Sequence, residues 1–200
     1  MEAILHGILL SFGLILPLGV QNLFVFSQGA TQPNLIRAFP ATITAALCDT
    51  LLILLAVFGI SVIIFQVHWL RTGLIMVGAI FLIYIGFTIW RSKAKTNEAT
   101  QAVPVRQQIL FAMSVSLLNP HAILDTVGVI GTNALKYDGV AQIYFTIACI
   151  SVSWVWFFGL TIAGATMKKL DVSGKLMNII NKCSALFIWG TAIYLILGIM

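Results

Sequence analysis

The chain has 200 residues, of which 60% are apolar and only 8% are charged, and its mean hydropathy is +1.04. A soluble domain carries roughly 25% charged residues. The composition therefore predicts an integral membrane protein and excludes an ordinary soluble domain. The net charge of +5 does not indicate nucleic-acid binding, because the cationic side chains are confined to short segments between apolar stretches.

Six apolar stretches are long enough to cross a bilayer core, which requires about 20 helical residues. We expect helices, because backbone polar groups in lipid have to be satisfied within each span, and no alternating barrel pattern is present. The predicted fold class is an all-α integral membrane protein. In chain order the predicted spans are Ala3–Phe26, Phe39–Phe65, Trp69–Trp90, Ile109–Gly131, Val140–Ala165 and Ile179–Met200.

Positive charge is distributed unevenly over the connections between these spans. All of the eleven Lys and Arg residues except Arg71 and Lys136 lie in or beside the connections after spans one, three and five. The positive-inside rule then places those three connections in the cytoplasm and both termini outside. The first residues, Met1–Ala3, show no basic start and no small-residue cleavage site follows, so we expect the first span to be retained.

The chain has the pattern of an internal duplication. Pro17 and Pro120 stand 103 residues apart, each inside an apolar span, and three spans precede the longest connection while three follow it. A repeat of three helices has to enter the membrane in the opposite direction the second time, which predicts an inverted pair. The expected parts are a first repeat (1–90), a cytoplasmic linker (91–107) and a second repeat (108–200). Chance resemblance among Leu- and Ile-rich helices is the alternative.

Both prolines are predicted to break the helices that contain them. Proline removes one backbone donor and clashes with the carbonyl four residues earlier. The downstream half-helix then begins with unpaired N–H groups and the positive end of its dipole, which favour an anion such as a carboxylate. Two broken helices that converge from opposite sides are typical of a transport site near the bilayer midplane. A purely structural kink is the alternative for either proline taken singly.

Two acidic residues, Asp49 and Asp125, lie within predicted spans. A carboxylate in the bilayer costs at least ~2.5–3.5 kcal/mol, so each is expected to face a cavity or a partner. His121 precedes Asp125 by four residues, and the two would share one face of a regular helix. Asp125, His121 and Asp49 are therefore the candidates for proton coupling. A permanently protonated Asp that donates a hydrogen bond between helices is the alternative for each acid.

The predicted binding site combines these residues with polar and aromatic neighbours. Two acids, no deep fixed base and nearby helix N-termini suit a zwitterion with an additional positive charge, such as arginine or lysine. Trp156 is placed either against the cavity, where it could stack on a guanidinium, or toward lipid. The predicted substrate-binding residues are Pro17, Gln21, Asn22, Asp49, Asn119, Pro120, His121, Asp125, Ser153 and Trp156.

Four segments of the chain resemble the lysine exporter (LysE) family, most closely its arginine-exporting branch. They are Ile15–Asn22, Cys48–Leu52, Leu118–Thr126 and Trp156–Leu160, and they fall in four of the predicted spans. Family members usually read G-P-Q-N where this chain has Gly19-Val20-Gln21-Asn22. The resemblance implies export of basic amino acids from a bacterium across its plasma membrane, driven by protons or by the membrane potential.

Alternative functions remain open at the level of sequence. An exporter of neutral amino acids or another small metabolite fits the same architecture, and an intramembrane enzyme with paired aspartates is the alternative from another class. That enzyme would show GxGD or HExxH within a span, and neither motif occurs. The three cysteines lie singly in apolar segments and are interpreted as packing residues, so no metal or cofactor is expected. The expected partners are the amino-acid substrate, a coupling proton or cation, membrane lipid, and a second copy in a possible homodimer.

Overall fold

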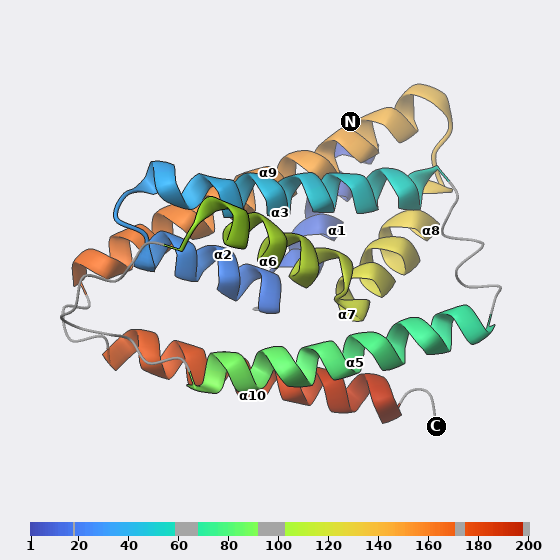
Figure 1. Cartoon of the computed structure of the whole chain (residues 1–200). Helices are drawn as coiled ribbons and strands as arrows, with labels where there is room; N and C mark the ends of the chain where they lie inside the picture. The colour runs from blue at the N-terminus through green and yellow to red at the C-terminus, as the bar shows by residue number, and fades with distance from the viewer. Residues whose placement is uncertain (18, 59–67, 92–102, 171–174, 198–200) are drawn as a thin grey trace.

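The computed structural model describes residues 1–17, 19–58, 68–91, 103–170 and 175–197. All regular secondary structure in these ranges is helical, which confirms the predicted all-α class (Figure 1). The helices are α1 (Glu2–Ile15), α2 (Val20–Thr31), α3 (Leu35–Val57), α5 (His68–Arg91), α6 (Val105–Leu117), α7 (Pro120–Leu124), the π-helix η1 (Asp125–Ile130), α8 (Gly131–Ala134), α9 (Gly139–Leu170) and α10 (Lys175–Leu197).

Three of these helices, α3, α9 and α10, are each long and apolar enough to cross a membrane. The bent pair α1 and α2 passes the same test as one span, and so does the bent pair formed by α6 and the helical run Ala122–Ala134. The described part of the chain therefore contains up to five candidate spans by this measure. The predicted span Trp69–Trp90 lies within α5. The apolar part of this helix, Ile75–Arg91, is shorter than a usual membrane span.

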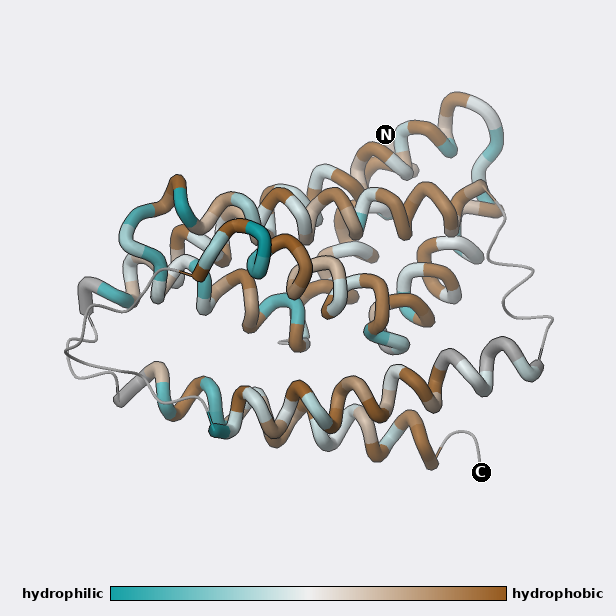
Figure 2. The backbone as a smooth tube through the Cα atoms, in the orientation of Figure 1, coloured by the Kyte–Doolittle hydropathy of each residue, from teal (hydrophilic) through white to brown (hydrophobic). Residues whose placement is uncertain are grey.

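The hydropathy of the residues agrees with this choice of candidate spans. Figure 2 shows long apolar stretches along α3, α9 and α10, with hydrophilic residues gathered near the helix ends. Parts of three predictions lie outside the described residues: the end of the second span (59–65), most of the linker (92–102) and the end of the sixth span (198–200).

Both predicted helix breaks are confirmed. Helix α1 ends at Ile15 and α2 begins at Val20 after a bend of 80°, with Pro17 in the connection. Helix α6 ends at Leu117, and the chain bends by 59° before the next helical run. Pro120 is the first residue of α7, a position at which a helix needs no N–H group.

The predicted pairing of His121 with Asp125 requires a regular α-helix, and the second broken span is not a regular α-helix at this point. The α-helical turn α7 passes into the π-helix η1 at Asp125. A π-helical turn is wider than an α-helical turn, so the four-residue spacing does not carry its usual meaning there. Such local widening is frequent at functional sites. The side chain of His121 lies outside the described part of the structure.

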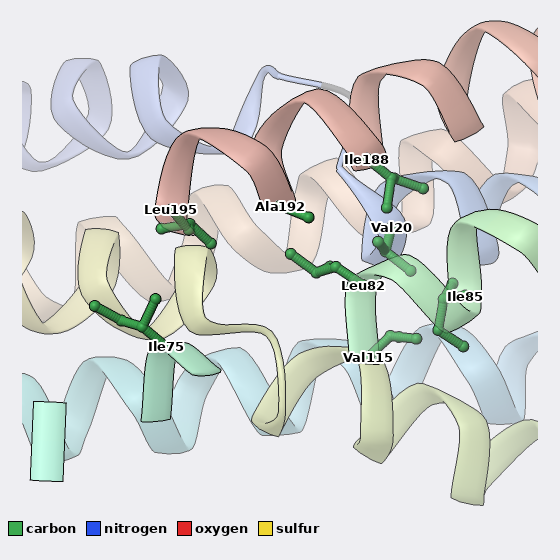
Figure 3. Close-up of a cluster of buried hydrophobic side chains, with 8 residues drawn as sticks. All are labelled: Val20, Ile75, Leu82, Ile85, Val115, Ile188, Ala192 and Leu195. Carbon is green, nitrogen blue, oxygen red and sulfur yellow. The ribbon is translucent and has the colours of Figure 1, made fainter. Parts of the chain in front are cut away.

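The helices form two layers. Helices α5 and α10 lie side by side and antiparallel in one layer, and the remaining helices form the other (Figure 1). In the larger layer α9 packs against α1, α2 and α3, while α3 packs against α6 and η1. An apolar cluster joins the layers and is drawn in Figure 3; it comprises Val20, Ile75, Leu82, Ile85, Val115, Ile188, Ala192 and Leu195.

Helices α2 and α9 approach each other at two glycines. A Cβ atom added to Gly29 would collide with the carbonyl group of Thr161, and one added to Gly164 would collide with the carbonyl group of Phe26. Small residues allow membrane helices to pack at such short distances. The contact fixes α2, which begins at the end of the first break, against α9, the longest of the helices in the described ranges.

A buried polar cluster ties several elements together at one end of the bundle. Gln108 Nε2 donates hydrogen bonds to the carbonyl oxygens of Arg37 and Val103, both at 2.9 Å. Gln32 Nε2 donates to the same Val103 oxygen at 3.3 Å, and Lys168 Nζ donates to the Gln32 carbonyl oxygen at 2.7 Å. These bonds join the α2–α3 connection, the start of α6 and the last part of α9. This cluster was not predicted from the sequence.

The close approach of α2 and α9 predicts that Gly164→Ala destabilises the protein. The added methyl group has to push the Phe26 carbonyl away, and overpacking of this kind costs about 1–3 kcal/mol. The measurement is thermal unfolding of the purified protein in detergent. Gly159→Ala is the matched control, because it lies on the same helix and its added Cβ would meet no atom within 4 Å. Equal unfolding midpoints for the two variants would contradict the close contact.

Candidate functional site

A cavity of about 120 Å³ lies where the two helix breaks face α3, α9 and α10. This volume is many times the minimum of about 10–15 Å³ that one water molecule requires, so the cavity has room for a small organic molecule. Its wall includes residues of α1, α2, α3, α5, η1, α9 and α10 and the connections at both breaks. The cavity therefore belongs to both halves of the chain.

The structure brings most of the predicted binding residues to this cavity. Seven of them contribute to its wall: Pro17, Gln21, Asn22, Asp49, Asn119, Asp125 and Ser153. Pro120 is buried but does not line the cavity, and a Cβ atom on Gly78 of α5 would collide with its ring. Trp156 is not in the wall but contacts Asn22. The side chain of His121 is not described.

The wall of the cavity carries two acidic side chains. Asp49 on α3 and Asp125 at the start of η1 both line the cavity and are half-buried, and the described residues of the wall include no Lys or Arg. Ser153 Oγ on α9 donates a hydrogen bond to Asp49 Oδ2 at 2.6 Å. Hydrogen bonds to an ionised acceptor are shorter and stronger than neutral ones. The cavity therefore offers carboxylate oxygens to a positively charged group.

The start of α2 contributes the opposite electrostatic character. Gly19 precedes the helix in an extended conformation, and its carbonyl accepts the first intrahelical bond, from the N–H of Leu23. The N–H groups of a helix's first turn have no acceptor within the helix, and they carry the positive end of the dipole. Because Gly19, Val20 and Gln21 line the cavity, one wall presents donors suited to an anion.

Side chains of helix α9 donate hydrogen bonds to residues of α2 and α3 at this wall. In addition to the Ser153 bond to Asp49, Trp154 Nε1 donates to Thr50 Oγ1 at 3.0 Å. Trp156 Nε1 donates to Asn22 Oδ1 at 3.3 Å, and its ring meets that of Phe12 edge-on at 5.8 Å. The indole of Trp156 thus has partners within the protein, although the sequence left open whether it faces the cavity or lipid.

Several wall residues were not identified from the sequence. They include Ser11 and Cys149, which line the cavity from α1 and α9, and Phe187, Ile188 and Thr191, which line it from α10. The last three recur at the spacing of one helix face, a signal that could have grouped them. In an apolar membrane helix, however, polarity does not distinguish the buried face from the lipid face, so this spacing alone does not select the face.

Two helices broken beside a cavity that contains two acidic side chains, in an apolar bundle, are the architecture of a membrane transporter. The sequence matches the LysE type translocator family over residues 12–198, and the chain belongs to this family. It is a multi-pass amino-acid translocator and not an enzyme. The family expected from the sequence motifs is confirmed.

Individual relatives cover nearly the whole chain. The putative amino-acid transporter YisU of Bacillus subtilis is 53% identical over 97% of this chain and 89% of its own length. The arginine exporter protein ArgO of Escherichia coli K12 is 31% identical over 95% of this chain and 91% of its own length, and that of Klebsiella pneumoniae is 33% identical over the same shares. The higher identity to YisU means that the expected membership of the arginine branch is not established. No solved structure matches the chain.

The short bond between Ser153 and Asp49 predicts that Ser153→Ala destabilises the protein. The substitution leaves one oxygen of a half-buried carboxyl group without this donor, and the loss of such a bond costs about 1–3 kcal/mol. The measurement is again the thermal unfolding midpoint. Ser151→Ala on the same helix is the control, because Ser151 is exposed and bonds only to its own helix, at the carbonyl of Ile147. If Ser153→Ala unfolds at the midpoint of the control, the bond contributes nothing to stability.

Proposed function

We propose that this translocator exports basic amino acids, arginine or lysine, across the bacterial plasma membrane by alternating access. The observation that carries the proposal is the pair of carboxyl groups, Asp49 and Asp125, in a cavity wall whose described residues include no Lys or Arg. A zwitterion alone brings one positive charge to such a wall. A basic amino acid brings a second, and it balances both acids.

The arrangement supports a definite orientation of the substrate. The α-carboxylate would accept hydrogen bonds from the first N–H groups of α2, where Gly19 and Val20 line the cavity. The α-ammonium and the side-chain cation would bind the carboxylates of Asp49 and Asp125. Between these groups the methylene chain of arginine or lysine would contact apolar side chains such as Leu82 and Ile188.

Coupling to protons follows from the same chemistry. A proton and a cationic substrate compete for the same carboxylate oxygens, so binding of one favours release of the other. Asp125, Asp49 and His121 are the proposed proton-coupling residues, and the membrane potential is the other possible driving force. Asp125 lies at the transition from α7 to η1, where the wider turn leaves room for local rearrangement during transport.

The inverted repeat is part of this proposal, and the packing supports it. Helices α1 and α2 of the first half pack on α9 of the second, while α6 and η1 of the second half pack on α3 of the first. Corresponding helices also meet, α3 with α9 and α5 with α10. The bonds Asp49–Ser153 and Thr50–Trp154 each join residues 104 positions apart, close to the 103 that separate the two prolines.

The proposed topology has six spans with the cation-rich connections in the cytoplasm. The start of α3, the end of α5, the start of α6 and the end of α9 lie at one end of the bundle, and the start of α1 and the end of α10 lie toward the other (Figure 1). The first of these ends carries Arg37, Arg91, Arg106 and Lys168. This distribution favours both termini outside.

A neutral amino acid is the second candidate substrate. The wall contains apolar residues such as Leu14, Phe157 and Phe187, which would accommodate an apolar side chain. YisU, the relative with 53% identity, is named only as a putative amino-acid transporter. In that case one of the two carboxyl groups would be protonated during transport.

The proposal predicts that Asp49→Asn and Asp125→Asn each reduce efflux of labelled arginine or lysine from preloaded proteoliposomes by about thirtyfold or more. This factor corresponds to the loss of one partner of a buried charge pair. Asp138→Asn is the control, because Asp138 is exposed near the start of α9, and it should transport normally. Normal efflux by both cavity variants would contradict the site.

The topology predicts opposite labelling of two introduced cysteines in a cysteine-free background. Lys136→Cys should react with a membrane-impermeant maleimide in intact cells, because residue 136 is exposed and at the proposed outer end. Arg106→Cys should react only after the cells are permeabilised. The reverse pattern would contradict the orientation while leaving the substrate assignment untouched.

A further inference from the structure

The carboxamide of Asn22 is fully engaged by the protein itself. Its Nδ2 donates to the carbonyl oxygen of Ile15 at 2.6 Å and to that of Pro17 at 2.9 Å, and its Oδ1 accepts the bond from Trp156 at 3.3 Å. An Asn side chain has two N–H donors, and both are used here. The residue is 5% exposed. Little of its hydrogen-bonding capacity remains for a substrate.

One of the two acceptors, the carbonyl of Ile15, is a group that a broken helix leaves without a backbone partner, whereas the Pro17 carbonyl also accepts a bond from the N–H of Gly19 at 2.8 Å. Helix α1 ends at Ile15. The last carbonyl groups of a helix accept no hydrogen bond from N–H groups of the same helix. In a membrane no bulk water replaces the missing donors. Asn22, in the first turn of the next helix, supplies a donor to the last residue of α1 and to Pro17 in the connection. It therefore joins the two sides of the break.

Trp156 determines which way the carboxamide of Asn22 faces. An indole N–H can only donate, so it has to meet the oxygen of the carboxamide and not the nitrogen. With Oδ1 turned toward α9, Nδ2 is turned toward the carbonyls of Ile15 and Pro17. Trp156 itself is held by the edge of Phe12 on α1. The pair thus connects α1, α2 and α9 at the first break.

We propose that Asn22 and Trp156 are positioning residues, which set the geometry of the α1–α2 break through a Trp156–Asn22–carbonyl chain, and are not ligands of the transported amino acid. This replaces the direct substrate-binding role expected for both residues from the sequence. The transport kinetics that test this proposal rest on the proposed function, whereas the thiol-modification measurement described below does not.

The second break is held by different chemistry. The residue five positions after Pro120 is Asp125, and a carboxyl group has no N–H groups with which to donate to two carbonyls as the carboxamide of Asn22 does. Pro120 packs instead against α5, where Gly78 leaves room for its ring. The corresponding position in the two halves therefore serves two purposes: Asn22 stabilises the first break, and Asp125 presents charge to the cavity.

The test uses a cysteine in the first break as a reporter of its geometry. Gly19 lines the cavity, and a Cβ atom added there would meet no atom within 4 Å, so Gly19→Cys is tolerated sterically. Cys48, Cys149 and Cys183 are first replaced by Ala, because Cys149 also lines the cavity. The rate of modification of the introduced thiol by a small maleimide is then measured in proteoliposomes.

Asn22→Ala and Trp156→Phe should each raise this modification rate by roughly three- to tenfold, the factor that one lost hydrogen bond makes in a local opening equilibrium. Thr50→Val is the matched control, because it removes the bond from the neighbouring indole of Trp154 without touching the break, and it should leave the rate unchanged. Trp156→Phe retains the ring against Phe12, so the test stands even if Asn22→Ala does not fold.

Kinetics of labelled arginine counterflow separate positioning from binding. A positioning role lowers the maximal rate in both variants and leaves KM within about twofold, because the groups that contact the substrate are intact. Unchanged thiol modification together with a raised KM and an unchanged maximal rate would overturn the proposal and make Asn22 a ligand. If the parent protein shows no arginine counterflow but modification changes as expected, the substrate assignment fails and the positioning role stands.

Discussion

The constraint on which this structure depends is that a helix broken inside a membrane leaves backbone carbonyl and N–H groups without partners. The chain contains two such breaks, near Pro17 and Pro120, and both face the same cavity. At the first break the carbonyls of Ile15 and Pro17 are satisfied by Asn22, while the N–H groups at the start of α2 border the cavity. The backbone groups that the break leaves unpaired are energetically unfavourable, and the partial charges of the same groups produce a local electrostatic field. That field is what a carboxylate in the cavity would experience.

Specific contacts between helices fix the position of this site within a largely apolar bundle. Helix α9 contacts α2 through the close approach at Gly29 and Gly164, and it bonds to α3 through Ser153 and Trp154. The glutamine cluster around Gln108 fastens one end of the same layer. Helices α5 and α10 form a separate layer that meets the rest mainly through apolar contacts. Apolar contacts are non-directional, so this layer is the one better suited to shift in the alternating-access cycle that we propose.

The sequence predicts much of this arrangement because burial in lipid makes some residues conspicuous. A proline or a carboxylate inside an apolar span is costly, so Pro17, Pro120, Asp49 and Asp125 stand out without any structure. The contribution of α10 to the cavity and the glutamine cluster were not predicted, because an apolar helix in lipid has no polar face to reveal its orientation. The positioning role that we propose for Asn22 was not predicted from the sequence either. A carboxamide next to a cavity suggests a ligand, and only the positions of the Ile15 and Pro17 carbonyls show where its donors go.

The central claim of this account is that the two cavity acids select a substrate with a second positive charge. Counterflow of labelled arginine into proteoliposomes tests it most directly, with an excess of unlabelled lysine or of citrulline as competitor. Citrulline has nearly the shape of arginine but a neutral side chain, so it isolates the contribution of charge. The account predicts that lysine competes strongly and citrulline hardly at all. Equal competition by citrulline and unlabelled arginine would contradict it.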